Sequence, residues 1–119
     1  MPNPNILPSF SESCKIGENL AGNRFLAQPL EHNQANEHGG FSTPLIDFYS
    51  RMRNGKWGFI VMETTAIDFT QKCRENALVL SPDKQNEASW ISFFKQVQDP
   101  DLDTLWVVEI SAAGYKNIS

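Results

Sequence analysis

The sequence predicts an α/β protein built around a parallel sheet, because apolar runs of strand length alternate with segments that begin as helices do. Three apolar runs have the length and composition of strands: residues 24–28, 58–63 and 105–110. The intervening segments open on Thr43-Pro44 and Ser81-Pro82, and a hydroxyl residue followed by proline is a typical helix start. A strand–helix–strand–helix–strand order favours parallel strands joined by right-handed crossovers.

The composition is that of one ordinary globular domain. The chain has 119 residues, of which 40% are hydrophobic and 20% charged, and its net charge is -4. No basic stripe is present, so nucleic acid is not an expected partner. No apolar run approaches the roughly 20 residues needed to span a bilayer, and the amino terminus lacks a secretory signal pattern. We therefore expect a cytoplasmic chain in which Cys14 and Cys73 are reduced.

The first predicted strand, residues 24–28, is followed directly by polar residues. Its short apolar run predicts a buried strand. Pro29 has no backbone N–H, so pairing with a neighbouring strand should stop there. Residues 31–34 then lie on a loop at the carboxyl end of the strand, where parallel α/β proteins bind ligands. Before this strand, residues 15–20 predict a hairpin that turns near Gly17.

The two predicted helices have recognisable ends. Thr43 is expected to cap the first helix, with Pro44 at its first position, and Asn54-Gly55 ends it. The second helix is expected to follow Ser81-Pro82 and to end before Asp99-Pro100, since a residue before proline disfavours helical angles. Its expected buried stripe consists of apolar residues spaced by three, with Trp90 beside them: Ala88, Ile91, Phe94 and Val97. The aromatic cluster of Trp90, Phe93 and Phe94 is interpreted as core, not as a ligand platform.

The second predicted strand, residues 58–63, is continuously apolar up to its last residue, as in a strand covered on both faces. Residues 64–66 are expected to leave the strand. Residues 67–80 have no clear periodicity and predict an irregular connection. His32 and His38 are interpreted as ordinary loop histidines, because no third metal ligand has suitable spacing.

Four motifs in this order carry a resemblance to a known family. They are Lys15-Ile16-Gly17 followed by Asn23-Arg24, then Gln28-Pro29-Leu30-Glu31, then residues 58–66, and finally Leu80-Ser81-Pro82-Asp83-Lys84. Over residues 7–116 the chain resembles the N-terminal third of the Old Yellow Enzyme, or NADH:flavin oxidoreductase, family. The resemblance implies a partial (β/α)₈ barrel, about the first three βα units preceded by a short N-terminal hairpin. Residues 1–119 would form one segment, with residues 1–22 as an irregular arm and residues 23–119 as the strand–helix units.

The resemblance also implies a cofactor site. The family binds FMN and reduces activated alkenes or related small molecules with NAD(P)H. By position, Gln28, Pro29 and Leu30 would lie along the flavin, Glu31 near its reactive edge, and the backbone of Thr64 beside it. Glu63 could face the site, but the family position chiefly supplies backbone, so a structural role is expected for it. Glu109 stands where the family commonly has a glutamine that pairs with the flavin pyrimidine, and a carboxylate can only accept hydrogen bonds. No catalytic residue and no metal ligand can be assigned, because the family's substrate-anchoring and proton-donating residues would lie beyond residue 119.

Three hypotheses about function follow from these features. The leading one is an FMN-binding oxidoreductase fragment or subunit that is inactive alone. A full barrel takes about 250 residues, so three strands would leave open sheet edges that invite a complementing chain or a second copy. The alternative is a non-catalytic, degenerate barrel fragment or interaction module. A third reading, an independent small α/β binding domain, rests only on the strand–helix alternation.

Overall fold

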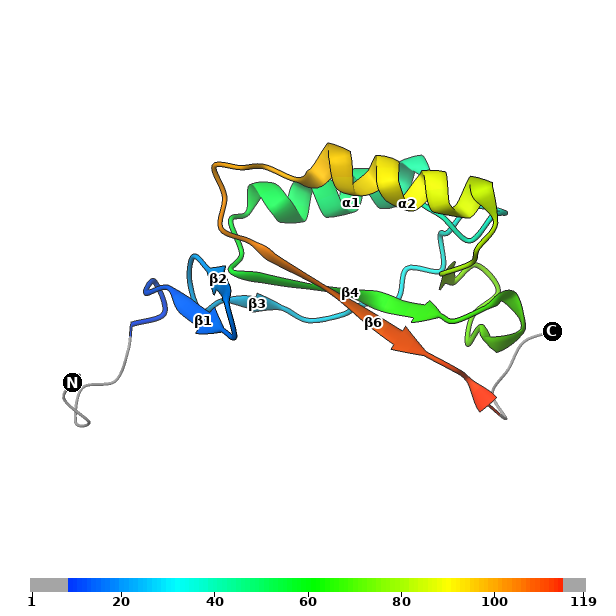
Figure 1. Ribbon diagram of the computed structural model, residues 1–119, viewed down its shortest axis with the longest axis horizontal. Coiled ribbons are helices and arrows are strands. Elements are labelled where there is room, and N and C mark those ends of the chain that lie inside the picture. The colour runs from blue at the N-terminus through cyan, green and yellow to red at the C-terminus, as the bar shows by residue number, and fades with distance from the viewer. Residues whose placement is uncertain (1–8, 115–119) are drawn as a thin grey trace.

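The computed structural model describes residues 9–114. Both helices lie on the same side of the sheet, and a small antiparallel hairpin stands at one end of it (Figure 1). The elements in chain order are β1 (Cys14–Ile16), β2 (Asn19–Ala21), β3 (Leu26–Ala27), α1 (Thr43–Asn54), β4 (Phe59–Ala66), the 3₁₀ turn η1 (Phe69–Gln71), β5 (Leu78–Val79), α2 (Lys84–Val97) and β6 (Leu105–Ser111).

β4 is the central strand of a parallel sheet. β6 pairs with it from Phe59 to Ala66, while β3 pairs with its first two residues and β5 with its last two. Because a strand has only two edges, β3 and β5 share the edge that β6 leaves free. The predicted strand–helix–strand–helix–strand order with parallel strands is confirmed. The predicted hairpin is also confirmed, with Gly17 at φ +60° in its turn.

Three strand predictions need correction. β3 has two residues instead of five, and Leu26 is 52% exposed, so the first strand is not buried as expected. β4 continues through Ala66, where the sequence predicted an exit after Glu63. β5 lies inside the segment predicted to be irregular, and a two-residue strand that exists only by pairing with Thr65 and Ala66 leaves no periodic signal.

A β-bulge interrupts the pairing of β4 with β6. Val61 pairs with Val107, but the next regular pair is Thr64 with Glu109, so Met62 and Glu63 together oppose Val108. The bulge reverses the alternation of side chains along β4. Ile60, Met62 and Glu63 are buried, while Val61 and Thr64 share the opposite face with Val107 and Glu109.

The carboxyl ends of both helices were predicted correctly, but the caps at their amino ends were not, and α2 begins at Lys84 instead of Pro82. Ser42, not Thr43, is the N-cap of α1, and its hydroxyl accepts from the backbone N–H of Leu45. Asp83, not Ser81, caps α2, because its carboxylate accepts from the backbone N–H of Asn86. In both cases the capping side chain must reach an N–H two or three residues into the helix, and only the backbone path decides which candidate does so.

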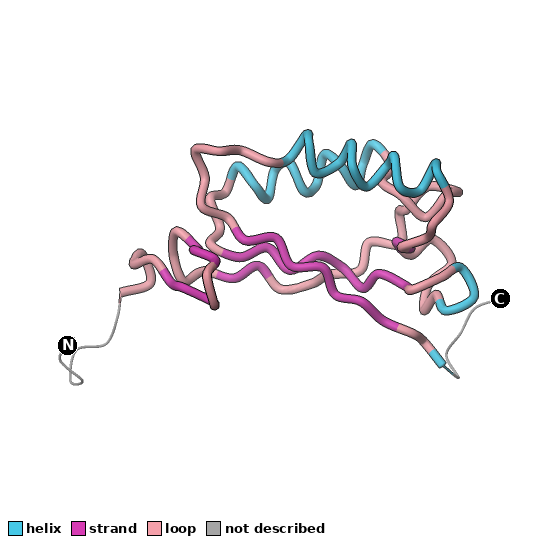
Figure 2. Tube along the Cα trace, in the orientation of Figure 1, coloured by secondary structure: helices cyan, strands magenta, loops and turns pink. Residues whose placement is uncertain are grey.

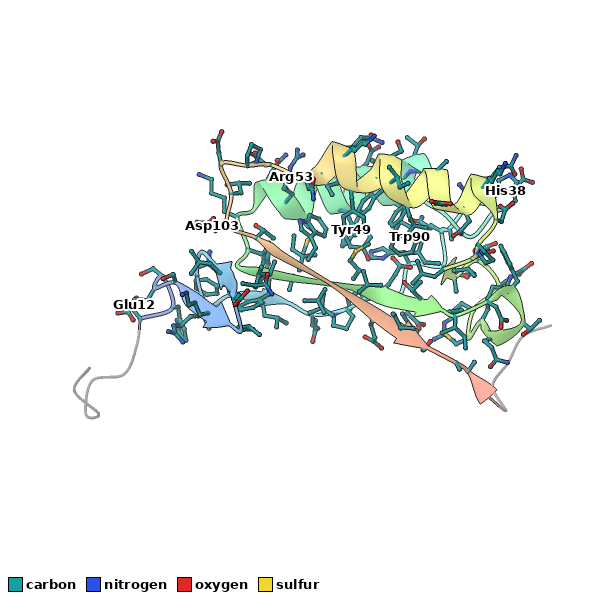
Figure 3. All side chains as sticks on the ribbon, viewed as in Figure 1. Glu12, His38, Tyr49, Arg53, Trp90 and Asp103 are labelled. Atoms are coloured by element: carbon teal, nitrogen blue, oxygen red, sulfur yellow. The ribbon has the colours of Figure 1, made fainter. Side chains whose placement is uncertain are left out.

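The core lies between the helices and the sheet. The rings of Phe41 and Phe93 stack with centroids 3.8 Å apart, and Tyr49 and Trp90 lie between the helices and the strands (Figure 3). The buried face of α2 carries Asn86, Trp90, Phe93 and Val97. The interpretation of Trp90 and Phe93 as core is confirmed, and Phe94 packs half-buried against that core. The predicted stripe is wrong at Ala88 and Ile91, since a spacing of three drifts around a helix that repeats every 3.6 residues. Ala88 is exposed, Phe94 is half-buried and Ile91 is 47% exposed.

No helix covers the other face of β4 and β6 within residues 9–114, as the tube in Figure 2 makes visible. Apolar side chains lie open on it, with Val107 42% exposed on β6 and Leu26 52% exposed on β3. The β1–β2 hairpin joins the sheet only at the amino-terminal end, where the N–H of Gly22 donates to the carbonyl of Asp103 over 2.7 Å. The carboxyl end of this open face is thus accessible.

Candidate functional site

Two of the predicted site residues meet at the carboxyl end of the open face. Thr64 and Glu109 are direct partners in the β4–β6 ladder, so their side chains point to the same side of the sheet. The Thr64 hydroxyl donates to Glu109 Oε1 over 3.1 Å. Their pairing depends on the bulge, because regular alternation would turn Thr64 toward the helices and Glu63 away from them.

The turn formed by Gln28, Pro29, Leu30 and Glu31 follows β3 directly. All four residues are exposed and lie outside regular structure. Pairing with β4 ends at Ala27, so strand pairing stops before Pro29, as predicted. The turn therefore leaves the sheet at the carboxyl end of its strand, as the site hypothesis requires.

Glu31 is held by the connection between β4 and β5. Its carboxylate accepts from Arg74 Nε over 3.0 Å and from Cys73 Sγ over 3.1 Å. Burial and the neighbouring Glu31 carboxylate raise the pKa of the Cys73 thiol. Glu31 and the Thr64–Glu109 pair thus belong to different hydrogen-bonded groups.

A third polar group lies on the helix side of β4, and the sequence interpretation missed it. The Glu63 carboxylate is buried, accepts from the Tyr49 hydroxyl over 3.0 Å, and lies 3.0 Å from His32 Nδ1. Burial and the Glu63 carboxylate raise the pKa of Tyr49 far above its ordinary range. The burial of Glu63 agrees with the structural role expected of it. His32 was interpreted as an ordinary loop histidine, but its ring and its backbone both contact the Glu63 carboxylate. A charged residue inside an apolar strand was the available signal, because such a residue needs a buried partner.

Other expectations concern metals and membranes. Among residues 9–114, no group of three histidine, cysteine or acidic side chains lies close enough to hold a metal ion. His38 is half-buried and lies on the loop before α1.

None of the helices in this described range has the length and apolar character needed to cross a bilayer.

The sequence comparisons give one partial relative. No family model matches the chain. An NADH oxidase from Thermoanaerobacter brockii is 38% identical over 68 residues, which are 57% of this chain and 10% of that protein. The chain therefore spans about a tenth of the length of this curated relative.

The solved structures give the fold. The Old Yellow Enzyme from Trypanosoma cruzi superimposes with a TM-score of 0.76 at 17% identity, over 92% of this chain and 28% of that one. The Old Yellow Enzyme homologue from Zymomonas mobilis gives 0.73 at 19% identity, over 88% and 28%. A 2-naphthoyl-CoA reductase gives 0.81 at 14% identity, over 92% of this chain and 16% of that one. The resemblance to the Old Yellow Enzyme family expected from the motifs is thus confirmed, and the chain folds as a part of that family's (β/α)₈ barrel.

Proposed function

We propose that this chain supplies two walls of an FMN site in an Old Yellow Enzyme-like oxidoreductase, the Gln28–Glu31 turn and the Thr64–Glu109 pair, and that a complementing chain or a second copy supplies the rest. The observation that carries the proposal is the Thr64–Glu109 pair at the carboxyl end of two parallel strands, on the open face. In barrels of this kind, ligands bind at that end.

The side chains on this face suit a flavin chemically. Leu26, Val61 and Val107 offer an apolar strip for a flat ring, and the strip ends at the polar Thr64–Glu109 pair. By resemblance, the backbone at Gln28, Pro29 and Leu30 would line the ring, Glu31 would lie near its reactive edge, and Thr64 and Glu109 would border its pyrimidine side. Bound FMN would supply hydride transfer, with NAD(P)H as the reductant, while the chain contributes position and electrostatics.

The hydrogen-bonding capacity of Glu109 determines how well the Thr64–Glu109 pair suits a flavin. Its Oε1 already accepts from Thr64, which leaves Oε2 to accept from a donor such as a flavin N3–H. The same carboxylate has no hydrogen to donate to a flavin carbonyl, and it opposes the negative charge of a reduced flavin. We therefore expect oxidised FMN to bind better than reduced FMN.

Titration of the purified chain with FMN, followed by flavin fluorescence and equilibrium dialysis, tests the proposal. We expect saturable binding that Thr64→Val weakens at least several-fold, since the hydroxyl that orients Glu109 is lost. Glu87→Gln, an exposed carboxylate on α2 away from the open face, is the matched control and should leave binding unchanged. No retained flavin, even with the product of any adjacent reading frame added, would overturn the proposal.

The complementing chain is proposed from the open surface of the sheet. Val107 of β6 is 42% exposed and Leu26 of β3 is 52% exposed on this face, which is unusual for apolar residues in a parallel sheet. Parallel sheets are normally covered on both faces, and an uncovered strand edge invites pairing with another chain. Sedimentation velocity should show self-association or capture of a complementing chain. A monodisperse monomer that unfolds cooperatively would contradict this.

A second candidate, a non-catalytic barrel fragment or interaction module, is favoured by the carboxylate at position 109. An ionised Glu109 places negative charge where the family commonly has a neutral amide. Glu109→Gln discriminates the two functions. If the wild-type chain fails to bind FMN and Glu109→Gln binds it, loss of an ancestral flavin site becomes the better account.

A further inference from the structure

We infer that Tyr49, Glu63 and His32 form a positioning network, which fixes both walls of the proposed FMN site from the helix side of the sheet. The inference rests on the proposed function, because the walls in question are the Gln28–Glu31 turn and the Thr64–Glu109 pair. None of the three residues lies on the open face. They would act through the backbone that carries the walls.

The first step is the bulge in β4. With Met62 and Glu63 both opposing Val108, the Glu63 side chain turns to the helix side and Thr64 to the open side. A strand without the bulge would place Glu63 beside Glu109 and turn Thr64 away from it. Whatever holds the bulge therefore decides which residue faces the proposed flavin.

Tyr49 of α1 holds that bulge through one hydroxyl group. The hydroxyl accepts from the backbone N–H of Glu63 over 3.0 Å and donates to Glu63 Oε1 over 3.0 Å. At the bulge this N–H finds its partner in a side chain of α1, which satisfies a buried donor. The Tyr49 ring is fixed in turn by packing against Phe41 and Phe93.

His32 ties the turn after β3 to the same carboxylate. Its Nδ1 lies 3.0 Å from Glu63 Oε1, and its backbone N–H donates to Glu63 Oε2 over 3.4 Å. The imidazole packs on Phe48 of α1, with ring centroids 4.0 Å apart. Because His32 follows Glu31 directly, anchoring its backbone fixes the end of the Gln28–Glu31 turn relative to β4.

Burying the Glu63 carboxylate in the core costs free energy of desolvation. Glu63 is 1% exposed, and an apolar residue of similar size would avoid the desolvation of a carboxylate. Glu63 gathers donors from the α1 side chain Tyr49 and from both the backbone and the ring of His32, so one group joins three separate segments. Such convergence specifies a unique geometry more than it adds stability.

NMR spectroscopy and amide hydrogen exchange on the full chain test this inference. We expect Tyr49→Phe to speed exchange of the Glu63 amide roughly tenfold, the loss of about one net hydrogen bond. The Thr64 and Leu30 amide resonances should also move. Thr104→Val removes a comparable hydroxyl bond, to the Trp57 carbonyl at the other end of the sheet, and should leave those resonances in place.

Variants of the partly exposed His32 keep the test decisive if Tyr49→Phe unfolds the chain. His32→Ala should shift Leu30 and Thr64, and His32→Gln, whose amide can still donate to Glu63, should restore much of the wild-type spectrum. A role in stability alone would lower the melting temperature without moving the Thr64 and Leu30 resonances. Unmoved resonances in Tyr49→Phe and His32→Ala would overturn the inference.

FMN titration separates the inference from the proposed function. If the wild-type chain binds FMN, Tyr49→Phe and His32→Ala should weaken binding about tenfold, while Thr104→Val should not; equal binding by all variants would refute the positioning role. If the wild-type chain binds no FMN, the proposed function fails. The resonance shifts then still decide whether the network fixes the two walls.

Discussion

The two faces of the central sheet differ in almost every physical respect. The face toward the helices is covered by aromatic and aliphatic side chains of the helices, with Phe93 of α2 and Leu45 of α1 fully buried. The opposite face has half-exposed apolar residues, among them Leu26 and Val107, and a polar pair at one end. Adjacent residues of β6 illustrate the difference, since Val108 packs against the core while Val107 lies open.

This difference separates stability from the proposed chemistry. The apolar area that the described residues remove from water lies mainly between the helices and the sheet, so folding free energy should come mainly from that face. The proposed FMN wall lies on the other face, where substitutions should alter binding or association with little effect on folding. The Tyr49–Glu63–His32 network connects the two.

The strongest test replaces the centre of the helix-side core. Phe93→Ala removes a fully buried ring that contacts Phe41, Tyr49 and Trp106, and should lower the free energy of unfolding by about 3–5 kcal/mol. Urea denaturation measures the change. Ile91→Ala, on the exposed side of the same helix, is the control and should cost under about 1 kcal/mol. Equal costs at both positions would show that the core is not where the structure has it.

The second test uses the adjacent valines of β6. Val108→Thr puts a hydroxyl against the apolar core and should destabilise the fold by about 1–2 kcal/mol. Val107→Thr makes the same chemical change on the open face and should alter stability by less than about 0.5 kcal/mol. Light scattering should show that Val107→Thr also reduces self-association. A larger stability loss at Val107 would mean that the open face is covered in solution.

The third test exploits the raised pKa of Tyr49. Burial and the Glu63 carboxylate raise it above the ordinary value of 10.0, so the folded state keeps its proton where the unfolded state loses it. The stabilising contribution is complete below pH 10 and declines as pH rises above it, by at most about 1.4 kcal/mol per unit. Comparing alkaline urea melts of the wild type and Tyr49→Phe isolates this effect. Identical pH dependence in both would contradict the buried hydroxyl.

The smallest effect is expected at Asp68, which lies in the connection after β4 and outside both faces. The Thr70 hydroxyl and backbone N–H donate to its carboxylate and lower its pKa below the ordinary value of 3.8. The resulting stabilisation is present above pH 3.8 and is lost as pH falls through the lowered pKa. Carboxyl ¹³C titration should show Thr70→Val moving the Asp68 midpoint upward. An unmoved midpoint would remove Thr70 as the cause.

The order of elements was predictable because it depends on local chemistry. Pro29 stopped the first strand, Asn54-Gly55 ended α1, and the residue pair Asp99-Pro100 limited α2, each through the backbone of a few neighbouring residues. The motif resemblance then supplied the barrel and named Thr64 and Glu109 as residues of one cofactor site. Whether these two and the Gln28–Glu31 turn bind FMN stays a prediction.

The bulge, the short strand β5 and the true buried face of α2 were set by tertiary structure. The bulge depends on how β4 pairs with β6. It brings Thr64 opposite Glu109, 45 residues later in the chain, and local sequence does not encode that register. Likewise, Glu63 reads as one charged residue in an apolar run until α1 brings Tyr49 to it. Sequence alone therefore determined the long strands, the two helices and their order, through local backbone propensity. Tertiary packing decided the register, and register decides which side chains share a face.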